Sequence, residues 1–338
     1  MAKDVIPFLK YCIVVFLFSY GIFYTSYKYG QPELGNRDFF RYEKMVDSPL
    51  NLHATISPTV LRQVPALVAY SIKQTGIYYN SRIAFEDAKK YKGENTQQNF
   101  FALILSNYLA YIIAIALIIN YLVKAGGFSS AKAVYLPVLA FSLGYFMVPV
   151  NIIAPLSQGY GWLVAVLLSI GLISRSMGYI LAGSVLAIFS RETTLLFFIL
   201  LFAATAIHHL IYKIKNGFVY KGLLTMLGIF MCLLFLRSGF THGNEAQLSP
   251  LFLIKKSLSA ITREDYIFQA FFTQGLLFFL AGLVYIKYKT HAIIYICAIA
   301  GIVLIGGFGV GRIIGESFPY LVLLYLLPAT ERYVTATG

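Results

Sequence analysis

Long, uncharged apolar runs separated by short polar breaks dominate the chain from residue 100 to residue 327. A helix that crosses a bilayer needs about 20 consecutive apolar residues, and several runs reach that length. The pattern therefore predicts an all-α fold, a polytopic transmembrane helical bundle of about ten spans. The predicted spans cover residues 6–27, 100–123, 133–150, 160–174, two short or broken segments within 178–212, and then 219–236, 266–286, 292–311 and 318–327.

Two longer polar stretches interrupt this pattern, at residues 28–99 and 237–265. Within the first, a Ser-Pro pair precedes apolar positions at helical spacing, which predicts an amphipathic helix over about 58–75 lying on the membrane surface. We expect a single transmembrane domain over residues 1–338, with 28–99 as the first external loop and 237–265 as the second.

Composition and charge support a membrane protein and orient it. The chain is 59% hydrophobic, 12% charged and carries a formal net charge of +13. Much of that charge lies in short loops between spans, where lysine and arginine set orientation, so we expect no nucleic-acid partner. Ten spans place both termini in the cytoplasm and gather these residues on the cytoplasmic side: Lys3, Lys10, Lys124, Lys132, Arg175, Lys213, Lys215, Lys221, Lys287 and Lys289.

Two acidic residues of the first loop are candidate catalytic bases. Asp38 follows the first span by about ten residues, among aromatic residues and arginines, and a carboxylate there is placed to take a proton from an acceptor hydroxyl. The alternative is a solvated acid paired with Arg37 or Arg41. Asp47 is a second candidate base, although Asp47-Ser48-Pro49 also reads as a turn or cap.

The remaining candidate residues are charged groups in apolar surroundings, which usually mark a site. Arg191 and Glu192 are adjacent; they are interpreted either as ligands for a phosphate and a polar substrate group or as a structural pair between two half-helices. Arg312 and Glu316 stand four residues apart. They are interpreted either as substrate-binding residues, with Arg312 on a phosphate and Glu316 orienting an arginine or a sugar hydroxyl, or as an interfacial ion pair. Arg62 is interpreted either as a ligand for a phosphate or as an anchor that holds the surface helix to the lipid headgroups.

Three short stretches resemble poorly characterised bacterial members of the type C glycosyltransferase superfamily of integral membrane enzymes: Leu61-Arg62-Gln63-Val64-Pro65, Ser190-Arg191-Glu192-Thr193 and Gly311-Arg312-Ile313-Ile314-Gly315-Glu316-Ser317-Phe318-Pro319. The resemblance extends to an aspartate soon after the first span, a surface helix, and arginines and glutamates on the outer face. It implies transfer of a sugar from a polyprenyl-phosphate carrier, with a carboxylate of the first external loop as base. Position 36 is Asn where the family often has a second acid.

This resemblance leads to the expected function. We expect a membrane glycosyltransferase of cell-envelope polysaccharide biosynthesis in the bacterial inner membrane, with its active face external. It would transfer the sugar to a hydroxyl of a glycan, lipid or protein acceptor, inverting by direct displacement. We expect membrane lipids to surround the protein. No cluster of metal-ligating residues is expected, and whether the reaction needs a divalent cation stays open. The alternatives are a non-enzymatic translocator or assembly subunit for lipid-linked saccharide, and a polysaccharide polymerase.

Overall fold

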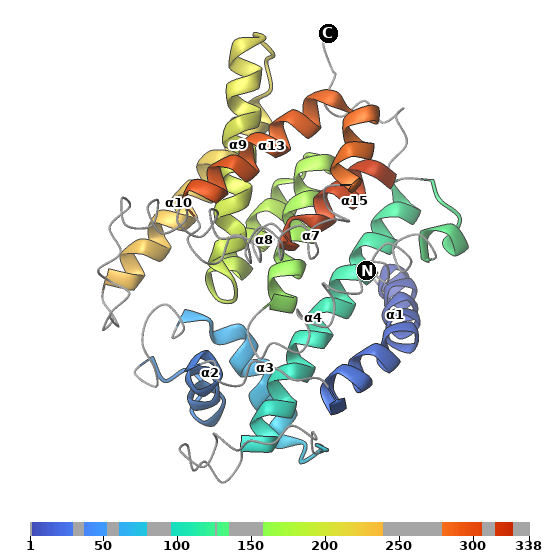
Figure 1. Cartoon of the computed structure of the whole chain (residues 1–338), viewed down its shortest axis with the longest axis vertical. Helices are drawn as coiled ribbons and strands as arrows, with labels where there is room; N and C mark the ends of the chain where they lie inside the picture. Colours follow the sequence, from blue (N-terminus) through green and yellow to red (C-terminus); the bar gives the residue numbers. More distant parts are fainter. Residues whose placement is uncertain are drawn as a thin grey trace, which may run out of the picture.

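The computed structural model describes residues 2–29, 37–52, 61–79, 96–125, 127–134, 158–238, 279–305 and 315–326. Every regular element within these ranges is helical, so the all-α prediction is confirmed for them. The labelled helices in Figure 1 are α1 (Ala2–Tyr29), α2 (Arg37–Asp47), α3 (Gln63–Gln74), α4 (Thr96–Lys124), α7 (Gln158–Ser174), α8 (Met177–Ile188), α9 (Glu192–Ile211), α10 (Gly217–Ser238), α13 (Lys289–Ile305) and α15 (Phe318–Leu326).

Three of these helices contain a segment long and apolar enough to cross a membrane: Gln97–Lys124 in α4, Glu192–Ile211 in α9 and Gly217–Leu236 in α10. This indicates a membrane protein. The arrangement of about ten spans stays a prediction, because most of the predicted spans 133–150 and 266–286 lies outside the described residues.

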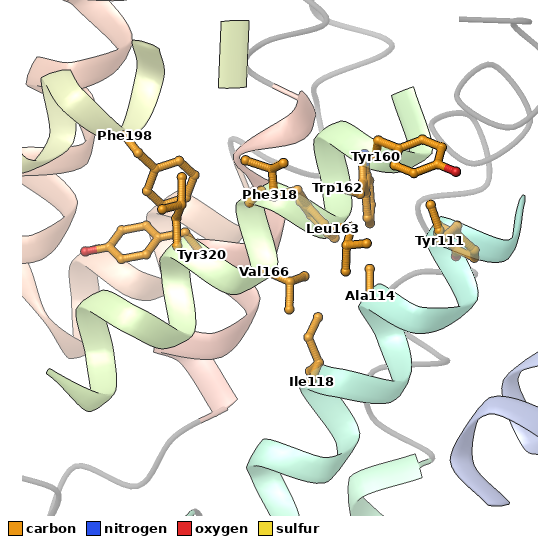
Figure 2. Close-up of a cluster of buried hydrophobic side chains, with 14 of the residues drawn as sticks. Tyr111, Ala114, Ile118, Tyr160, Trp162, Leu163, Val166, Phe198, Phe318 and Tyr320 are labelled. Carbon is orange, nitrogen blue, oxygen red and sulfur yellow. The ribbon is translucent and has the colours of Figure 1, made fainter. Parts of the chain in front are cut away.

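Helix α4 is the central element on which several other helices pack. It is 29 residues long, and α1, α3 and α7 lie against it (Figure 1). Large side chains fill the space between α4, α7, α9 and α15, as Figure 2 shows. Trp162 of α7 lies at its centre, with its ring 5.7 Å from that of Tyr111 and 6.0 Å from that of Phe318. This contact fixes the start of α7 between α4 and α15.

The first loop contains more regular structure than the sequence pattern predicted. Residues 37–47, for which no helix was predicted, form helix α2, because Tyr42, Met45 and Val46 are buried at helical spacing. The helix predicted over 58–75 corresponds to α3, which begins only at Gln63 and packs on α4. Pro65 explains this late start, because proline has no N–H to donate to the hydrogen bonds of a helix interior. In the first turn of a helix the N–H groups have no partner within the helix, so proline is tolerated there.

The two segments beside Arg191 and Glu192 differ in length. Helix α8 has 12 residues, or about 18 Å, and is short as predicted. Helix α9 has 20 residues and is long enough to span, so the prediction that this segment is short or broken is wrong. Both helices meet at Phe189–Arg191, where the Arg191 N–H donates to the Ala187 carbonyl at 2.8 Å. The short turn places charged side chains at the end of two apolar helices.

Candidate functional site

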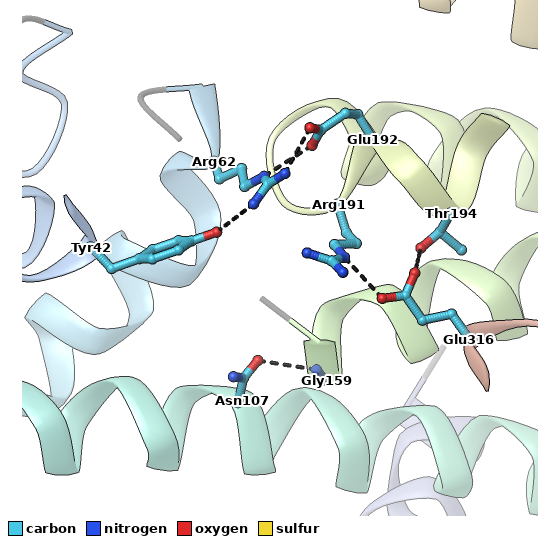
Figure 3. Close-up of polar contacts among 8 residues, drawn as sticks. All are labelled: Tyr42, Arg62, Asn107, Gly159, Arg191, Glu192, Thr194 and Glu316. Atoms are coloured by element: carbon cyan, nitrogen blue, oxygen red, sulfur yellow. Dashed lines mark hydrogen bonds and ion pairs between the residues drawn. The ribbon is translucent and has the colours of Figure 1, made fainter. Parts of the chain in front are cut away.

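Charged and polar side chains from five elements meet where α8 turns into α9 (Figure 3). We call the set the ionic network; its members are Tyr42, Arg62, Arg191, Glu192, Thr194 and Glu316. They come from α2, the residue before α3, the turn before α9, the first turn of α9, and the residues just before α15. The network therefore joins the first loop to the end of the chain.

Arg62 and Glu192 form a two-point ion pair across 130 residues of sequence. Nε and Nη2 of Arg62 donate to the two carboxylate oxygens of Glu192 at 3.0 and 2.7 Å, and Nη1 donates to the Tyr42 hydroxyl at 2.9 Å. Burial alone would lower the pKa of Arg62, but the Glu192 carboxylate and the Tyr42 oxygen raise it well above its ordinary value. Arg62 is therefore a permanent cation fixed by two partners.

Arg191 and Glu316 form a second ion pair, more deeply buried than the first. Nε of Arg191 donates to one oxygen of Glu316 at 2.8 Å, and the Thr194 hydroxyl donates to the other. The side chain of Arg191 is 7% exposed and that of Glu316 is 1% exposed. A charge this deeply buried is tolerated only when a partner compensates it, so each residue depends on the other.

The network lies at the starts of several helices. Arg62 immediately precedes α3, Arg191 immediately precedes α9, and Glu316 lies two residues before α15. A helix N-terminus carries a partial positive charge of about half a unit. The two carboxylates balance the two arginines, and the end of α8 lies at the same turn, where its Phe189 carbonyl accepts from the Val64 N–H in the first turn of α3.

Two glycines in the first turn of α7 allow the close packing that the network needs. A Cβ atom at Gly159 would lie 2.1 Å from the backbone oxygen of Asn107, and one at Gly161 would lie 2.7 Å from the carboxylate carbon of Glu316. The N–H of Gly159 donates to the side-chain oxygen of Asn107 at 3.1 Å. The start of α7 is thereby held against both α4 and Glu316.

The structure brings together four of the predicted substrate-binding residues, but in an unexpected pairing. The interpretation of Arg191 and Glu192 as a pair with each other is wrong, because each has its ion-pair partner on a different element. Their interpretation as ligands for a phosphate and a polar substrate group stays a prediction. The interpretation of Arg62 as a headgroup anchor is also wrong, because its guanidinium faces Glu192 inside the protein. Arg312 lies outside the described residues.

Three further polar residues belong to this region and were not identified from sequence: Tyr42, Asn107 and Thr194. Asn107 follows Ser106 inside the apolar run of α4, and that interruption was a usable signal. Tyr42 and Thr194 gave none, because tyrosine and threonine are common at membrane interfaces and in apolar helices.

The two candidate bases lie at opposite ends of α2. Asp38 is its second residue, one helical turn before Tyr42, and its side chain is outside the described part of the structure. Asp47 is its last residue. One oxygen of Asp47 accepts from Lys73 at 2.6 Å and from the side-chain amide of Asn99 at 2.9 Å. Asp47 thus links α2 to α3 and α4, a structural role that leaves Asp38 as the better candidate base.

We expect the Lys73–Asp47 pair to contribute little to stability. The side chain of Asp47 is 47% exposed, and exposed pairs are worth about 1 kcal/mol or less. Lys73→Met should therefore lower the free energy of unfolding by less than about 1 kcal/mol. Chemical unfolding in mixed micelles would measure this. A loss several times larger would mean that the pair is shielded from solvent.

No match was found for this chain among protein-family models, curated proteins or solved structures. The resemblance to type C glycosyltransferases thus remains a prediction from short stretches of sequence. Among the described residues, no group of three His, Cys, Asp or Glu side chains is arranged to hold a metal ion.

Proposed function

We propose that the protein is a membrane glycosyltransferase that moves a sugar from a polyprenyl-phosphate carrier to a hydroxyl acceptor, with inversion by direct displacement. The observation that carries the proposal is the ionic network itself. It joins α2, which contains Asp38, to Arg62 before α3 and to the buried Arg191 between the apolar helices α8 and α9. A base and a phosphate ligand on neighbouring elements beside lipid-facing helices are what this reaction requires.

In the proposed reaction, the acceptor oxygen forms a bond to the anomeric carbon of the sugar as the bond from that carbon to the carrier phosphate breaks. Asp38 takes the proton of the acceptor hydroxyl. The departing phosphate gains negative charge, and Arg191 stabilises that charge through its guanidinium. Glu316 orients Arg191, while the Arg62–Glu192 pair ties α3 to the start of α9.

Asp38→Asn tests the proposed base. Purified protein would be given a panel of polyprenyl-phosphate sugars with candidate acceptors, and transfer and carrier binding would be measured on the same sample. Removing a general base typically slows a reaction by about 10²–10⁴-fold, so transfer should fall by that factor while carrier binding stays near that of the parent. Asp47→Asn, measured in parallel, separates the two candidate bases of α2.

The outcomes distinguish the alternatives. Carrier binding with no transfer by the parent, from any donor in the panel, would contradict the glycosyltransferase and favour the translocator. Products longer than one added sugar would favour the polymerase. Transfer that is lost in Asp47→Asn and retained in Asp38→Asn would reassign the base to the other end of α2.

A further inference from the structure

Three histidines meet at the end of α9 that is far from the ionic network. His208 and His209 are in the last turn of α9, with their ring centres 6.0 Å apart, and His291 is in the first turn of α13. The two helices pack against each other (Figure 1), and His291 lies within electrostatic range of both other rings. At a rise of about 1.5 Å per residue, the α9 histidines lie about 25 Å along the helix from Glu192. In a helix long enough to span, this places them near the other face of the membrane.

Each of these rings has hydrogen-bonding capacity that the described part of the chain does not use. Nδ1 of His208, Nδ1 of His209 and Nε2 of His291 are buried without a hydrogen-bond partner among the described residues. His209 is 1% exposed, whereas His208 and His291 are half-buried and form the outer part of the cluster. A buried polar atom without a partner is costly, and an imidazole can donate a hydrogen bond to an anion beside it.

The charged side chains around the histidines are basic. Lys213 and Lys215 follow α9, Lys221 is near the start of α10, and Lys289 is the first residue of α13. The helices α7, α8, α10 and α13, which pack on α9, contain no aspartate or glutamate. These helices therefore supply no counter-charge, and the ligand that complements this end of α9 is an anion.

Lys213 occupies a backbone position where glycine is common. Its φ is +53°, in the left-handed region, and it directly follows Tyr212 at the end of α9. The N–H of Ile214 donates to the His209 carbonyl at 2.8 Å, as is typical where a helix ends in a left-handed residue. Lysine is less favourable than glycine in this conformation, but it places a cation beside the histidines.

The outer face of α9 next to this basic end is apolar and unpacked. Ile207, Leu210 and Ile211 are 58%, 68% and 68% exposed and lie on one face of the helix. Tyr212, which is 67% exposed, follows them, and tyrosine is enriched where a helix leaves the membrane. A ligand that matches both parts has an anionic group for the basic end and an apolar chain for this face.

We propose that the end of α9 and the start of α13 bind an anionic phospholipid of the adjacent membrane leaflet. Lys213 and Lys289 contact the headgroup phosphate, and His208 and His291 donate hydrogen bonds to it. The acyl chains lie along the exposed apolar face of α9. Basic groups at the ends of membrane helices attract anionic headgroups. The inference is independent of the proposed function, because it concerns the other end of α9 and can be measured without sugar transfer.

Lipid composition tests the site directly. Purified protein would be placed in nanodiscs of phosphatidylcholine with an increasing fraction of phosphatidylglycerol, and the thermal unfolding midpoint would be measured at each fraction. A lipid that binds only the folded protein stabilises it, so the midpoint should rise by a few degrees and then level off. The fraction of phosphatidylglycerol that gives half of this rise measures the affinity.

Lys213→Gly separates the charge of this residue from its backbone conformation. In phosphatidylcholine alone the midpoint should stay equal or rise, because glycine suits the left-handed position. The fraction of phosphatidylglycerol needed for half of the rise should increase by about fivefold, the usual effect of one lysine near an anionic surface. A residue that only stabilises the fold would show the opposite pattern, a lower midpoint in both lipids.

Two more variants test the headgroup contacts on α13. Lys289→Gln should also increase the required fraction by about fivefold. Lys10→Gln is its matched control, because it removes an exposed lysine of α1 that is predicted to lie on the same side of the membrane. It should respond as the parent does. His291→Phe keeps a flat ring without nitrogens, so it should retain the midpoint in phosphatidylcholine and show a smaller rise with phosphatidylglycerol.

The outcomes decide between a specific site and a general effect of charge. No rise of the parent midpoint with phosphatidylglycerol, or the same response in the parent, Lys213→Gly and Lys289→Gln, would overturn the inference. An equal loss in Lys10→Gln and Lys289→Gln would also overturn it, because general attraction to the basic surface would then account for binding. The expected lipid response in a protein that transfers no sugar would support the inference and contradict the proposed function.

Discussion

Replacing Arg191 with alanine is expected to lower the free energy of unfolding by about 3–5 kcal/mol, the usual cost of breaking a buried ion pair. The substitution leaves the carboxylate of Glu316, 1% exposed, with the Thr194 hydroxyl as its one donor in the part of the chain that the structure describes. A buried charge without its counter-charge loses far more solvation than one hydrogen bond restores. Chemical unfolding in mixed micelles, followed by the fluorescence of Trp162, measures the change.

Two comparisons make this prediction specific. Arg175→Ala removes an exposed arginine and should cost less than about 1 kcal/mol. The double substitution Arg191→Met with Glu316→Leu removes both charges and should recover much of the stability that Arg191→Ala loses, because replacing a whole buried pair by apolar groups is often neutral. Equal costs for Arg191→Ala and Arg175→Ala would show that the Arg191–Glu316 pair is not buried.

Gly159→Ala should be nearly as damaging, although it adds a single methyl group. The new Cβ would lie 2.1 Å from the backbone oxygen of Asn107 and 2.9 Å from its carbonyl carbon. Backbone atoms of α4 cannot move aside as a flexible side chain can, so α7 must shift away from α4 and lose the hydrogen bond from Gly159 to Asn107. Overpacking of this kind costs about 1–3 kcal/mol or more.

The same shift would move Gly161 away from Glu316, so Gly159→Ala should also weaken phosphate binding at Arg191. Gly228→Ala is the control: this residue lies within α10, and nothing lies within 4 Å of the position of its Cβ. That variant should be as stable as the parent or slightly more so, since alanine favours helix over glycine. If Gly159→Ala also proved neutral, the close contact of α7 with α4 would be wrong.

Hydrophobic patterning was sufficient for the individual long helices but not for their interactions. The apolar runs predicted α4 and α10 because each run is continuous and close to the length that a bilayer requires, whereas the segment that forms α9 was predicted to be short or broken. Helix α2 was missed, because charged residues lie between its buried positions Tyr42, Met45 and Val46 and make the stretch appear polar as a whole.

The charged residues were recognised as site candidates from their apolar surroundings, but their partners were not. Arg191 and Glu192 are adjacent, which suggested a local pair, whereas their true partners lie 125 and 130 residues away. Pairing at such a separation depends on how α3, α9 and α15 pack, and short stretches of sequence contain no signal for it. That packing alone also determines that Arg62 donates from three nitrogens, whereas Arg191 donates from Nε to Glu316.

The most direct test of the central claim, that the ionic network holds a lipid phosphate for sugar transfer, is the dependence of the initial transfer rate on donor concentration. Parent, Arg191→Lys and Arg175→Lys would be compared with the same polyprenyl-phosphate sugars. We predict that Arg191→Lys lowers kcat/KM by about tenfold or more, because it weakens contact with the phosphate in both the bound and the transition state. Arg175→Lys should match the parent. Equal kcat/KM for all three proteins, or no transfer by the parent from any donor, would contradict the claim.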